Sequence, residues 1–402
     1  MKRRIFGLIL VIMIISMTGC GGSPNPVNSS TGQPQSSSGQ PQSITGQSQS
    51  PAQREVVRLD EEGYLYYMDY TKDYYGSDVI DALRKAELID TGCSSFFTHN
   101  PEGEPITCRN YDYPHRVSDE DSTLTGLNIV LHCKPEGKYE SIAMADAVWC
   151  DEKNPLLQQG GPDKEGFEPA LLDIIPYQCM DGINEKGLCV SILKVDIKKG
   201  DQPASYPVGS SMLLRYMLDD CANVEEAIKK VDTAIVTPED WQDCHIFVTD
   251  ASGEYAVIES RNGKVSTARS DVVTNFYLTY DDIEDSYKNG KLREHAVMIT
   301  DEKGEKQYNY GYGHGYHRFS TIASQLESHR DTSAEKYRTV MPESAALVIL
   351  QSAAQNPYTK ASGVSMTQYS AIYNNEKKTM EVWPFQNYKT SYSFDVVGKQ
   401  IR

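Results

Sequence analysis

The sequence predicts an α+β fold, in which antiparallel sheets are packed against helices on their outer faces. Two observations support this class. Segments of strand-like composition occur in pairs joined by turn residues, and segments of helical periodicity occur in separate runs. Paired strands and segregated helices are typical of α+β domains rather than of alternating parallel folds. The residues alone do not specify the number of layers.

Composition narrows the classes of partner. The chain has 402 residues, enough for one large domain or two ordinary ones, and 39% of them are hydrophobic. Its net charge is −17 and the sequence contains no basic stripe, so nucleic acid is not an expected partner. The acidity says nothing about the substrate.

The first 19 residues predict a signal for export. Lys2, Arg3 and Arg4 form a basic start, residues 5–17 are apolar, and Thr18-Gly19-Cys20 places small residues before a cysteine. This pattern resembles a bacterial lipoprotein signal, with cleavage before Cys20 and a lipid on its thiol. We therefore expect a chain anchored to the cell membrane and facing outside the cytoplasm. An ordinary secretory signal is the alternative, and the apolar run is short for a membrane span.

Residues 20–54 predict a disordered tether. Residues 21–53 contain no charged side chain and are rich in Ser, Gly, Gln and Pro, so they cannot bury enough apolar surface to fold. A coil of this length spans roughly 30 Å on average.

Residues 55–92 predict an ordered pro-segment. Six tyrosines between 64 and 75 give it apolar bulk, and Val79, Ile80, Leu83 and Ala86 have helical spacing. An N-terminal extension that simply packs on the domain is the alternative.

The remaining elements follow in order along 93–402. Turn residues at 100–104, 135–138, 184–187, 252–253 and 262–263 separate paired strands, and Asn223 with Glu226 forms a capping box. Strands are expected at 94–98, 106–110, 127–133, 139–143, 187–193, 245–249, 255–259, 264–268, 368–373, 379–383 and 391–394. Helices are expected at 212–219, 224–231, 319–328 and 343–355.

The hairpin at 92–113 carries the candidate nucleophile. Its return strand would bring Arg109 and Asp112 back beside Cys93. A thiol with a guanidinium and a carboxylate in reach is an arrangement for nucleophilic catalysis. Taken alone, the stretch favours the alternative, a buried structural cysteine with a surface Arg and Asp.

Further motifs give this stretch a context. After Cys93 come Arg109-Asn-Tyr-Asp112, the run from Asp181-Gly-Ile-Asn to Leu188, a strand beginning at His245, then Thr274-Asn275 and Arg318-Phe319. In this order they resemble the choloylglycine hydrolase family of N-terminal-nucleophile amidases, which includes bile salt hydrolases and penicillin V acylases and has acid-ceramidase-like relatives. The resemblance covers nearly everything after residue 92 and implies a four-layer αββα sandwich.

The resemblance also implies roles. Cys93 would attack the amide carbonyl and its free α-amine would act as the base, while Arg109 would favour the thiolate and Asp112 would hold the amine or thiol. Asn275 would donate its side-chain amide to the oxyanion, and Arg318 would support the charge of the nucleophile. Permanent cations and neutral amide donors suit these tasks.

Lys194 departs from the family pattern, which commonly has Asn or Tyr there. The family implies that the backbone N–H at this position helps to form the oxyanion hole, and a backbone donor survives a change of side chain. A lysine side chain near the substrate puts bile-salt or penicillin specificity in doubt. It would suit an acyl chain that carries a carboxylate.

The family further implies self-cleavage between Gly92 and Cys93, which would free the amine and leave a catalytic chain of residues 93–402. The implied reaction is hydrolysis of linear N-acyl amides without a cofactor. An acyltransferase of the same superfamily and an inactive ligand-binding lipoprotein are the alternatives, and a homo-oligomer is compatible with either.

The other cysteines and three of the histidines are given no catalytic role. Setting aside Cys20 and Cys93, seven cysteines remain, with no CxxC spacing, so buried free thiols are expected and a metal site is not. We interpret His245 as structural and assign no role to His314 or His317.

Overall fold

The computed structural model describes residues 56–75, 83, 92–114, 126–151, 154–158, 161–195, 201–205, 209–279, 297–300, 306–309, 313–355, 365–398 and 400. Residues 51–402 group into one compact unit. The predicted signal and tether lie outside the described residues. So does the helix predicted around residues 79–86, apart from Leu83, which is buried.

Nine strands form the larger sheet, in the order β1-β2-β5-β6-β7-β8-β9-β10-β11. Their bounds are Val56–Arg58, Leu65–Tyr70, Asn128–Cys133, Ser141–Asp146, Cys179–Asn184, Cys189–Lys194, Cys244–Thr249, Tyr255–Arg261 and Lys264–Ala268. Neighbouring strands are antiparallel, except that β2 runs parallel to β5.

A smaller antiparallel sheet has the order β12-β3-β4-β15-β16-β17. Its strands are Val272–Val273, Gly92–His99, Pro105–Pro114, Ser365–Asn374, Thr379–Pro384 and Tyr392–Asp395. β13 (Val297–Thr300) and β14 (Lys306–Asn309) form a separate pair.

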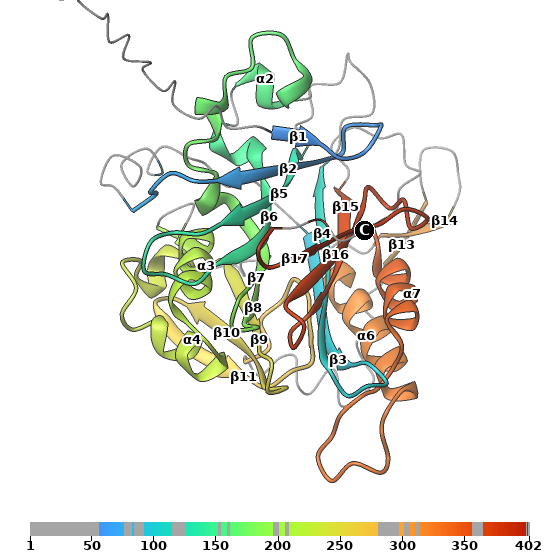
Figure 1. Ribbon diagram of the computed structural model, residues 1–402. Coiled ribbons are helices and arrows are strands. Elements are labelled where there is room, and N and C mark those ends of the chain that lie inside the picture. The colour runs from blue at the N-terminus through green and yellow to red at the C-terminus, as the bar shows by residue number, and fades with distance from the viewer. Residues whose placement is uncertain are drawn as a thin grey trace, which may run out of the picture. The chain divides into compact units, whose positions relative to one another are not determined.

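Helices cover the outer faces of the two sheets (Figure 1). α3 (Gly209–Asp220) and α4 (Val224–Lys230) pack on the larger sheet, while α6 (Gly313–Ser328) and α7 (Glu343–Ala353) pack on the smaller one. β3 contacts β8 across the space between the sheets. The layers are therefore helix, sheet, sheet and helix, and the predicted α+β class is confirmed.

Short helical segments complete the described chain. They are α2 (Pro155–Gln158), η1 (Ala147–Cys150), η2 (Gly161–Asp163), η3 (Pro169–Leu172), η4 (Ile175–Gln178) and η5 (Pro238–Asp240).

Two apolar cores follow from this layering. The larger one fills the space between the sheets and extends beneath α3, and it includes Tyr111, Ile192 and Leu214. The smaller one lies where α6 and α7 pack on β3 and β4, and it includes Phe96, Ile322 and Leu350. Because both faces of β3 are covered, six of its eight residues are buried.

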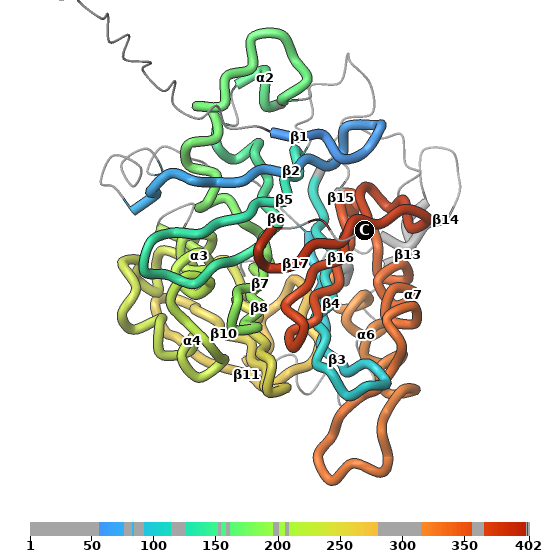
Figure 2. Tube along the Cα trace, in the orientation of Figure 1, coloured from blue at the N-terminus to red at the C-terminus, as the bar shows by residue number. Residues whose placement is uncertain are grey.

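The β3–β4 hairpin forms as its turn residues predict. The backbone N–H of Gly103 donates to the Asn100 carbonyl over 2.9 Å, and the N–H of Glu104 donates to Asn100 Oδ1 over 2.9 Å. Gly103 has a φ of 87°, a conformation that glycine adopts without strain. This turn fixes the register in which β4 returns along β3 (Figure 2).

Six of the described strands were not predicted, among them the short β12, β13 and β14. β1 and β2 occupy the predicted pro-segment, where we expected apolar bulk and a helix, and β7 coincides with the Asp181 motif. β2 buries Tyr66, Met68 and Tyr70 on one face, whereas on the other face Tyr67 is half-buried and Asp69 is exposed. Tyrosines on both faces hide this alternation in the sequence. β6 begins at Ser141, two residues later than predicted.

Among the described residues, no helix is long and apolar enough to span a bilayer. No group of three or more His, Cys, Asp or Glu residues in this part of the chain is arranged to hold a metal ion. The eight described cysteines are free thiols; seven are buried and Cys150 is half-buried.

Candidate active site

The candidate nucleophile lies near the start of a central strand. Cys93 is 1% exposed and pairs with Tyr111 across the β3–β4 ladder, while Gly92 pairs with Asp112. Because side chains alternate between the faces of a sheet, Arg109 shares the face of Cys93 and Asp112 lies on the opposite face. The side chains of the two predicted partners therefore lie on opposite faces of the smaller sheet.

Arg109 contacts the thiol directly. Its Nη2 donates to Cys93 Sγ over 3.0 Å and to the Ile192 carbonyl over 2.7 Å. Its Nε donates to Asp181 Oδ2 over 3.1 Å, and the guanidinium is completely buried. A buried guanidinium held on three sides has a fixed position, so its charge stays at the sulfur.

Asp181 is the residue that fixes Arg109. It lies on β7 of the other sheet, and its carboxylate accepts hydrogen bonds from Tyr369 Oη over 2.6 Å and from Tyr373 Oη. Burial raises the pKa of this carboxyl, whereas Arg109 and the tyrosines act in the opposite direction. Sequence reasoning identified Asp181 within a motif but gave it no role, because its partners come from distant strands.

We expect Asp181→Asn to destabilise the folded protein by about 3–5 kcal/mol, because it leaves the Arg109 charge buried without its partner. Urea unfolding monitored by circular dichroism measures the change in free energy of unfolding. Glu225→Gln is the control, since it removes an exposed ion pair with Lys229 and is expected to change little. Equal stability of Asp181→Asn and wild type would contradict the assigned role.

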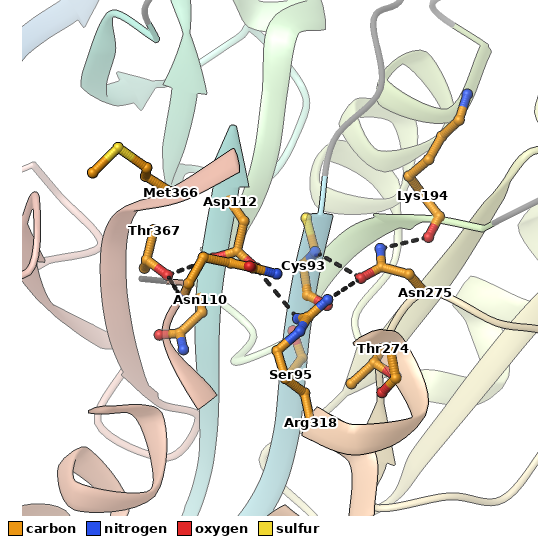
Figure 3. A network of polar contacts seen from close by, with 12 residues as sticks. Cys93, Ser95, Asn110, Asp112, Lys194, Thr274, Asn275, Arg318, Met366 and Thr367 are labelled. Atoms are coloured by element: carbon orange, nitrogen blue, oxygen red, sulfur yellow. Dashed lines mark hydrogen bonds and ion pairs between the residues drawn. The ribbon is translucent and has the colours of Figure 1, made fainter. Parts of the chain in front are cut away.

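Asn275 connects the backbone of Cys93 to β8. Cys93 N–H donates to Asn275 Oδ1 over 3.0 Å, and Asn275 Nδ2 donates to the Lys194 carbonyl over 2.7 Å (Figure 3). An amide nitrogen carries two N–H groups, so the bond to Lys194 uses one of the two donors. The structure thus places Asn275 beside Cys93, while its role as an oxyanion donor stays a prediction.

Arg318, on α6, reaches the same point from the helical layer. Its Nη1 donates to the Cys93 carbonyl over 2.6 Å and lies 3.3 Å from Asp112 Oδ2, and its Nη2 donates to Asn275 Oδ1. Thr367 Oγ1 donates to the other Asp112 oxygen over 2.6 Å. Asp112 therefore orients Arg318, a contact that the sequence did not predict.

Burial and neighbouring charges shift the pKa of the Cys93 thiol in opposite directions. Burial raises the pKa of Cys93, and the nearby Asp112 charge raises it further, whereas Arg109 and Arg318 lower it. Burial also raises the pKa of Asp112 to about 6, against the stabilising effect of Arg318 and Thr367. The uncut chain thus holds a thiol whose ionisation depends on two fixed cations.

Lys194 is present at the site mainly through its backbone. It ends β8, its carbonyl accepts from Asn275, and its amine lies apart from the polar network in Figure 3. Lys194 Nζ instead pairs with Asp243 Oδ2 at 2.8 Å. This carboxylate offsets the lysine charge, while the contact with an acidic acyl chain stays a prediction.

The histidines lie outside this network. His245 Nδ1 lies 2.7 Å from Glu259 Oε1 on the neighbouring strand, and both side chains are fully buried, which suits a structural ion pair. His317 is exposed on α6, and the side chain of His314 lies outside the described residues.

Taken together, the three polar groups of Cys93 are held by three different residues. Arg109 contacts its sulfur, Asn275 its nitrogen and Arg318 its carbonyl oxygen. This arrangement can stabilise a thiolate and orient the α-amine of the same residue, as nucleophilic attack on a carbonyl requires.

Comparison with known proteins gives the site a family. Residues 98–382 match the family described as acyl-coenzyme A:6-aminopenicillanic acid acyl-transferase. The matched range begins just after Cys93 and contains the other five predicted catalytic residues. No curated protein matches the sequence.

Three solved structures are similar to the chain. A mutant of conjugated bile acid hydrolase from Clostridium perfringens has 16% identity and a TM-score of 0.44, covering 77% of this chain and 96% of its own. Penicillin V acylase from Agrobacterium tumefaciens has 16% identity and a TM-score of 0.42, with coverage of 77% and 93%. An N-acylethanolamine-hydrolyzing acid amidase ortholog from Caenorhabditis elegans has 15% identity and a TM-score of 0.33, with coverage of 71% and 93%.

The family match spans most of the chain and confirms the resemblance that the motifs predicted. The chain therefore belongs to the acyl-coenzyme A:6-aminopenicillanic acid acyl-transferase family.

Proposed function

We propose that the chain is a cysteine amidase of the N-terminal-nucleophile type, which hydrolyses N-acyl amides after cutting its own chain between Gly92 and Cys93. The observation that carries this proposal is the separate fixing of the sulfur, nitrogen and carbonyl oxygen of one residue, Cys93. A structural cysteine needs no charged partner at its sulfur, because a buried thiol is satisfied by apolar packing.

Self-cleavage begins with attack of Cys93 Sγ on the Gly92 carbonyl carbon. The bond between that carbon and Cys93 N breaks, a thioester forms, and the nitrogen becomes a free amine. Water then hydrolyses the thioester, which releases a carboxylate on Gly92 and restores the thiol. The new amine would lie where the Cys93 N–H now meets Asn275 Oδ1, so the site already holds an acceptor for it.

Substrate hydrolysis repeats the same chemistry on an added amide. The thiol proton passes to the α-amine, whose unperturbed pKa of about 7.7–8.0 suits it as a base. Sγ attacks the acyl carbon, and the leaving amine takes the proton as the C–N bond breaks. Water then cleaves the acyl-thioester. The second N–H of Asn275 Nδ2 and the backbone N–H of Lys194 are the proposed donors to the oxyanion.

Self-cleavage and turnover are expected to fall as the pH drops through about 6, where Asp112 takes up a proton. The charged carboxylate orients Arg318, so the active form is present above this pKa and is lost below it. Rates measured from pH 4.5 to 8 should show this acidic limb.

Two variants test whether Asp112 causes the fall in rate at low pH. Asp112→Asn should lower the rate and remove the inflection. Asp271→Asn should retain it, since burial also raises the pKa of Asp271 to about 6 but this side chain lies away from Cys93 in the described structure. An unchanged inflection in Asp112→Asn would contradict the role of this carboxylate.

Acyl transfer is the second candidate, and the name of the matching family favours it. In this reaction an amine, rather than water, attacks the acyl-thioester. The two outcomes share every residue named above and differ only in the acceptor. Product analysis with and without an added amine separates them.

The location is part of the proposal. The start of the sequence favours export and a lipid on Cys20, which would hold the enzyme at the outer side of the cytoplasmic membrane. Labelling of growing cells with a fatty-acid analogue, compared with Cys20→Ala, tests the lipid.

The substrate is tested with a panel of amides. Matured protein is incubated with conjugated bile salts, penicillin V, acyl homoserine lactones and fatty-acid amides, and the released amine is measured. The expected result is turnover of at least one class, which Cys93→Ala lacks. Protein that is cut at Gly92 and yet releases no amine from any class would contradict the amidase proposal.

A further inference from the structure

A pocket lies at the end of β3 that is remote from Cys93. It has a volume of about 300 Å³ and is formed by the end of β3, the turn between β9 and β10, the residues just before β12, and residues 334–339. In Figure 1 this last segment belongs to the orange loop between α6 and α7. At about 3.3 Å per residue of strand, His99 in the pocket lies roughly 20 Å from Cys93. The described residues that line the pocket include none of the network around the thiol.

Two buried polar atoms of the pocket residues have no hydrogen-bond partner within the described structure. They are His99 Nδ1 and Asp271 Oδ2. Burial and the nearby Arg338 charge lower the pKa of His99, so its ring is neutral and one ring nitrogen accepts. A buried polar atom without a partner is costly, and such an atom in a pocket indicates a group that binds there.

Asp271 supplies the negative charge of the pocket. Burial raises its pKa to about 6, against hydrogen bonds from its own backbone and from Tyr337, so the carboxylate is ionised at pH 7.5. Its backbone carbonyl accepts from Phe97 N–H over 2.8 Å, which ties the residue to β3. A fixed carboxylate oxygen and a neutral imidazole both favour a ligand that donates hydrogen bonds. An ammonium group donates to both and matches the charge.

The exposed side of the pocket is positively charged. Arg269, Lys336 and Arg338 line it, and all three are exposed. Arg269 Nη1 pairs with Glu254 at 2.5 Å. Arg338 Nη2 pairs with Asp331 at 2.7 Å. Lys336 forms no ion pair with another described residue, so its charge is available to a carboxylate of the ligand.

Aromatic rings form the apolar wall. Phe97 is buried, and the centroid of its ring lies 4.9 Å from that of Tyr255. Gly253 leaves room beside them, because a side-chain carbon at this position would lie 3.2 Å from His99 Nε2. The volume is at the lower end of the range for ligand pockets, which favours a small ligand with an apolar part.

We propose that this pocket binds a free α-amino acid with an apolar or aromatic side chain, its ammonium group on Asp271 and His99 and its carboxylate at Lys336. A simple anion would face the Asp271 carboxylate and leave both buried acceptors without a donor. A simple amine would leave the cations of the exposed side without a counter-charge. A zwitterion satisfies both ends. The site is separate from the proposed amidase reaction, and a change in turnover is no part of this inference.

The test compares three compounds of the same shape by isothermal titration calorimetry of the full-length wild-type chain at pH 7.5. Phenylalanine carries both charges, phenethylamine lacks the carboxylate, and 3-phenylpropionate lacks the ammonium group. We expect phenylalanine to bind and each analogue to bind at least about tenfold more weakly, the usual effect of losing one charged hydrogen-bonding group.

Variants assign each charge to a residue. Lys336→Met should weaken phenylalanine binding about tenfold or more and leave phenethylamine binding unchanged. Asp271→Asn should weaken phenylalanine binding similarly and leave 3-phenylpropionate binding no weaker. Lys194→Met is the matched control, since it removes a lysine beside the Cys93 network, and it should keep wild-type affinity for phenylalanine. Circular dichroism confirms that each variant is folded; Lys336 is exposed, so its variant keeps the test valid if Asp271→Asn unfolds.

Three results would overturn the inference. Equal affinity for phenylalanine and either analogue would show that the pocket does not recognise a zwitterion. No binding of any of the three compounds at millimolar concentration would show that water alone occupies it. Loss of phenylalanine binding in Lys194→Met but not in Lys336→Met would place the ligand at the Cys93 site, and it would leave the amidase proposal standing.

Discussion

Cys93→Ala is expected to lower amide turnover on the order of 10⁶-fold in kcat, the loss that removal of a catalytic nucleophile causes. Arg109 contacts the sulfur that the proposal makes the nucleophile, and alanine leaves no group there to attack the amide. The same variant should remain uncut at Gly92. Amine release and intact mass measure the two effects.

Cys150→Ala is the matched control for this experiment. Its thiol is free and half-buried in η1 and has no contact with the site network. It should keep wild-type kinetics and an N-terminus at Cys93. Substantial turnover by Cys93→Ala would contradict the nucleophile, and an active wild type still continuous through Gly92–Cys93 would contradict the α-amine as base.

Asn275→Ala is expected to reduce kcat by roughly 10²–10³-fold, the usual loss for one oxyanion donor. The variant removes the proposed oxyanion donor and also the acceptor for Cys93 N–H. Steady-state kinetics on the best substrate of the panel measure the effect. A change confined to KM would show that Asn275 only binds substrate.

Loss of stability must be separated from loss of catalysis in this variant. Asn223→Ala removes the N-cap of α4, where Asn223 Oδ1 accepts from Glu226 N–H over 2.9 Å. It should cost about 1 kcal/mol of stability without lowering kcat. If Asn223→Ala and Asn275→Ala lost activity equally, the oxyanion role would be contradicted.

Local chemistry explains why much of the fold could be predicted. The β3–β4 turn depends on Asn100 and Gly103, and the start of α4 depends on Asn223, so each signal lies within a few residues of the feature it forms. Because these signals are local, they do not depend on distant parts of the chain. The class and most of the strands of 93–402 followed from them.

Features set by distant parts of the chain could not be predicted in this way. β2 alternates in burial but not in sequence, because tyrosines occupy both of its faces, and its parallel pairing with β5 leaves no turn signal. β7 contains Asp181, Gly182 and Asn184, which look like turn residues, yet the whole strand is buried. Their polar groups are satisfied by partners from other elements.

The site residues also divide into those placed by local sequence and those placed by contacts with distant parts of the chain. The spacing of Arg109 from Cys93 follows from one hairpin and was predicted directly, whereas Asn275 and Arg318 were found only through the family resemblance. Arg109, the carboxylate of Asp181 and its two tyrosines assemble from three strands of both sheets. No pattern within a single segment encodes that contact.

The parallel pairing of β2 with β5 has a consequence for refolding. In the uncut chain this pairing closes an intramolecular loop, so the sheet forms in a reaction that does not depend on protein concentration. If the Gly92–Cys93 bond is cut as proposed, the same step requires two chains to meet. Unfolding of the matured enzyme would then be irreversible at low concentration, and its lifetime would be set by the rate of unfolding rather than by an equilibrium.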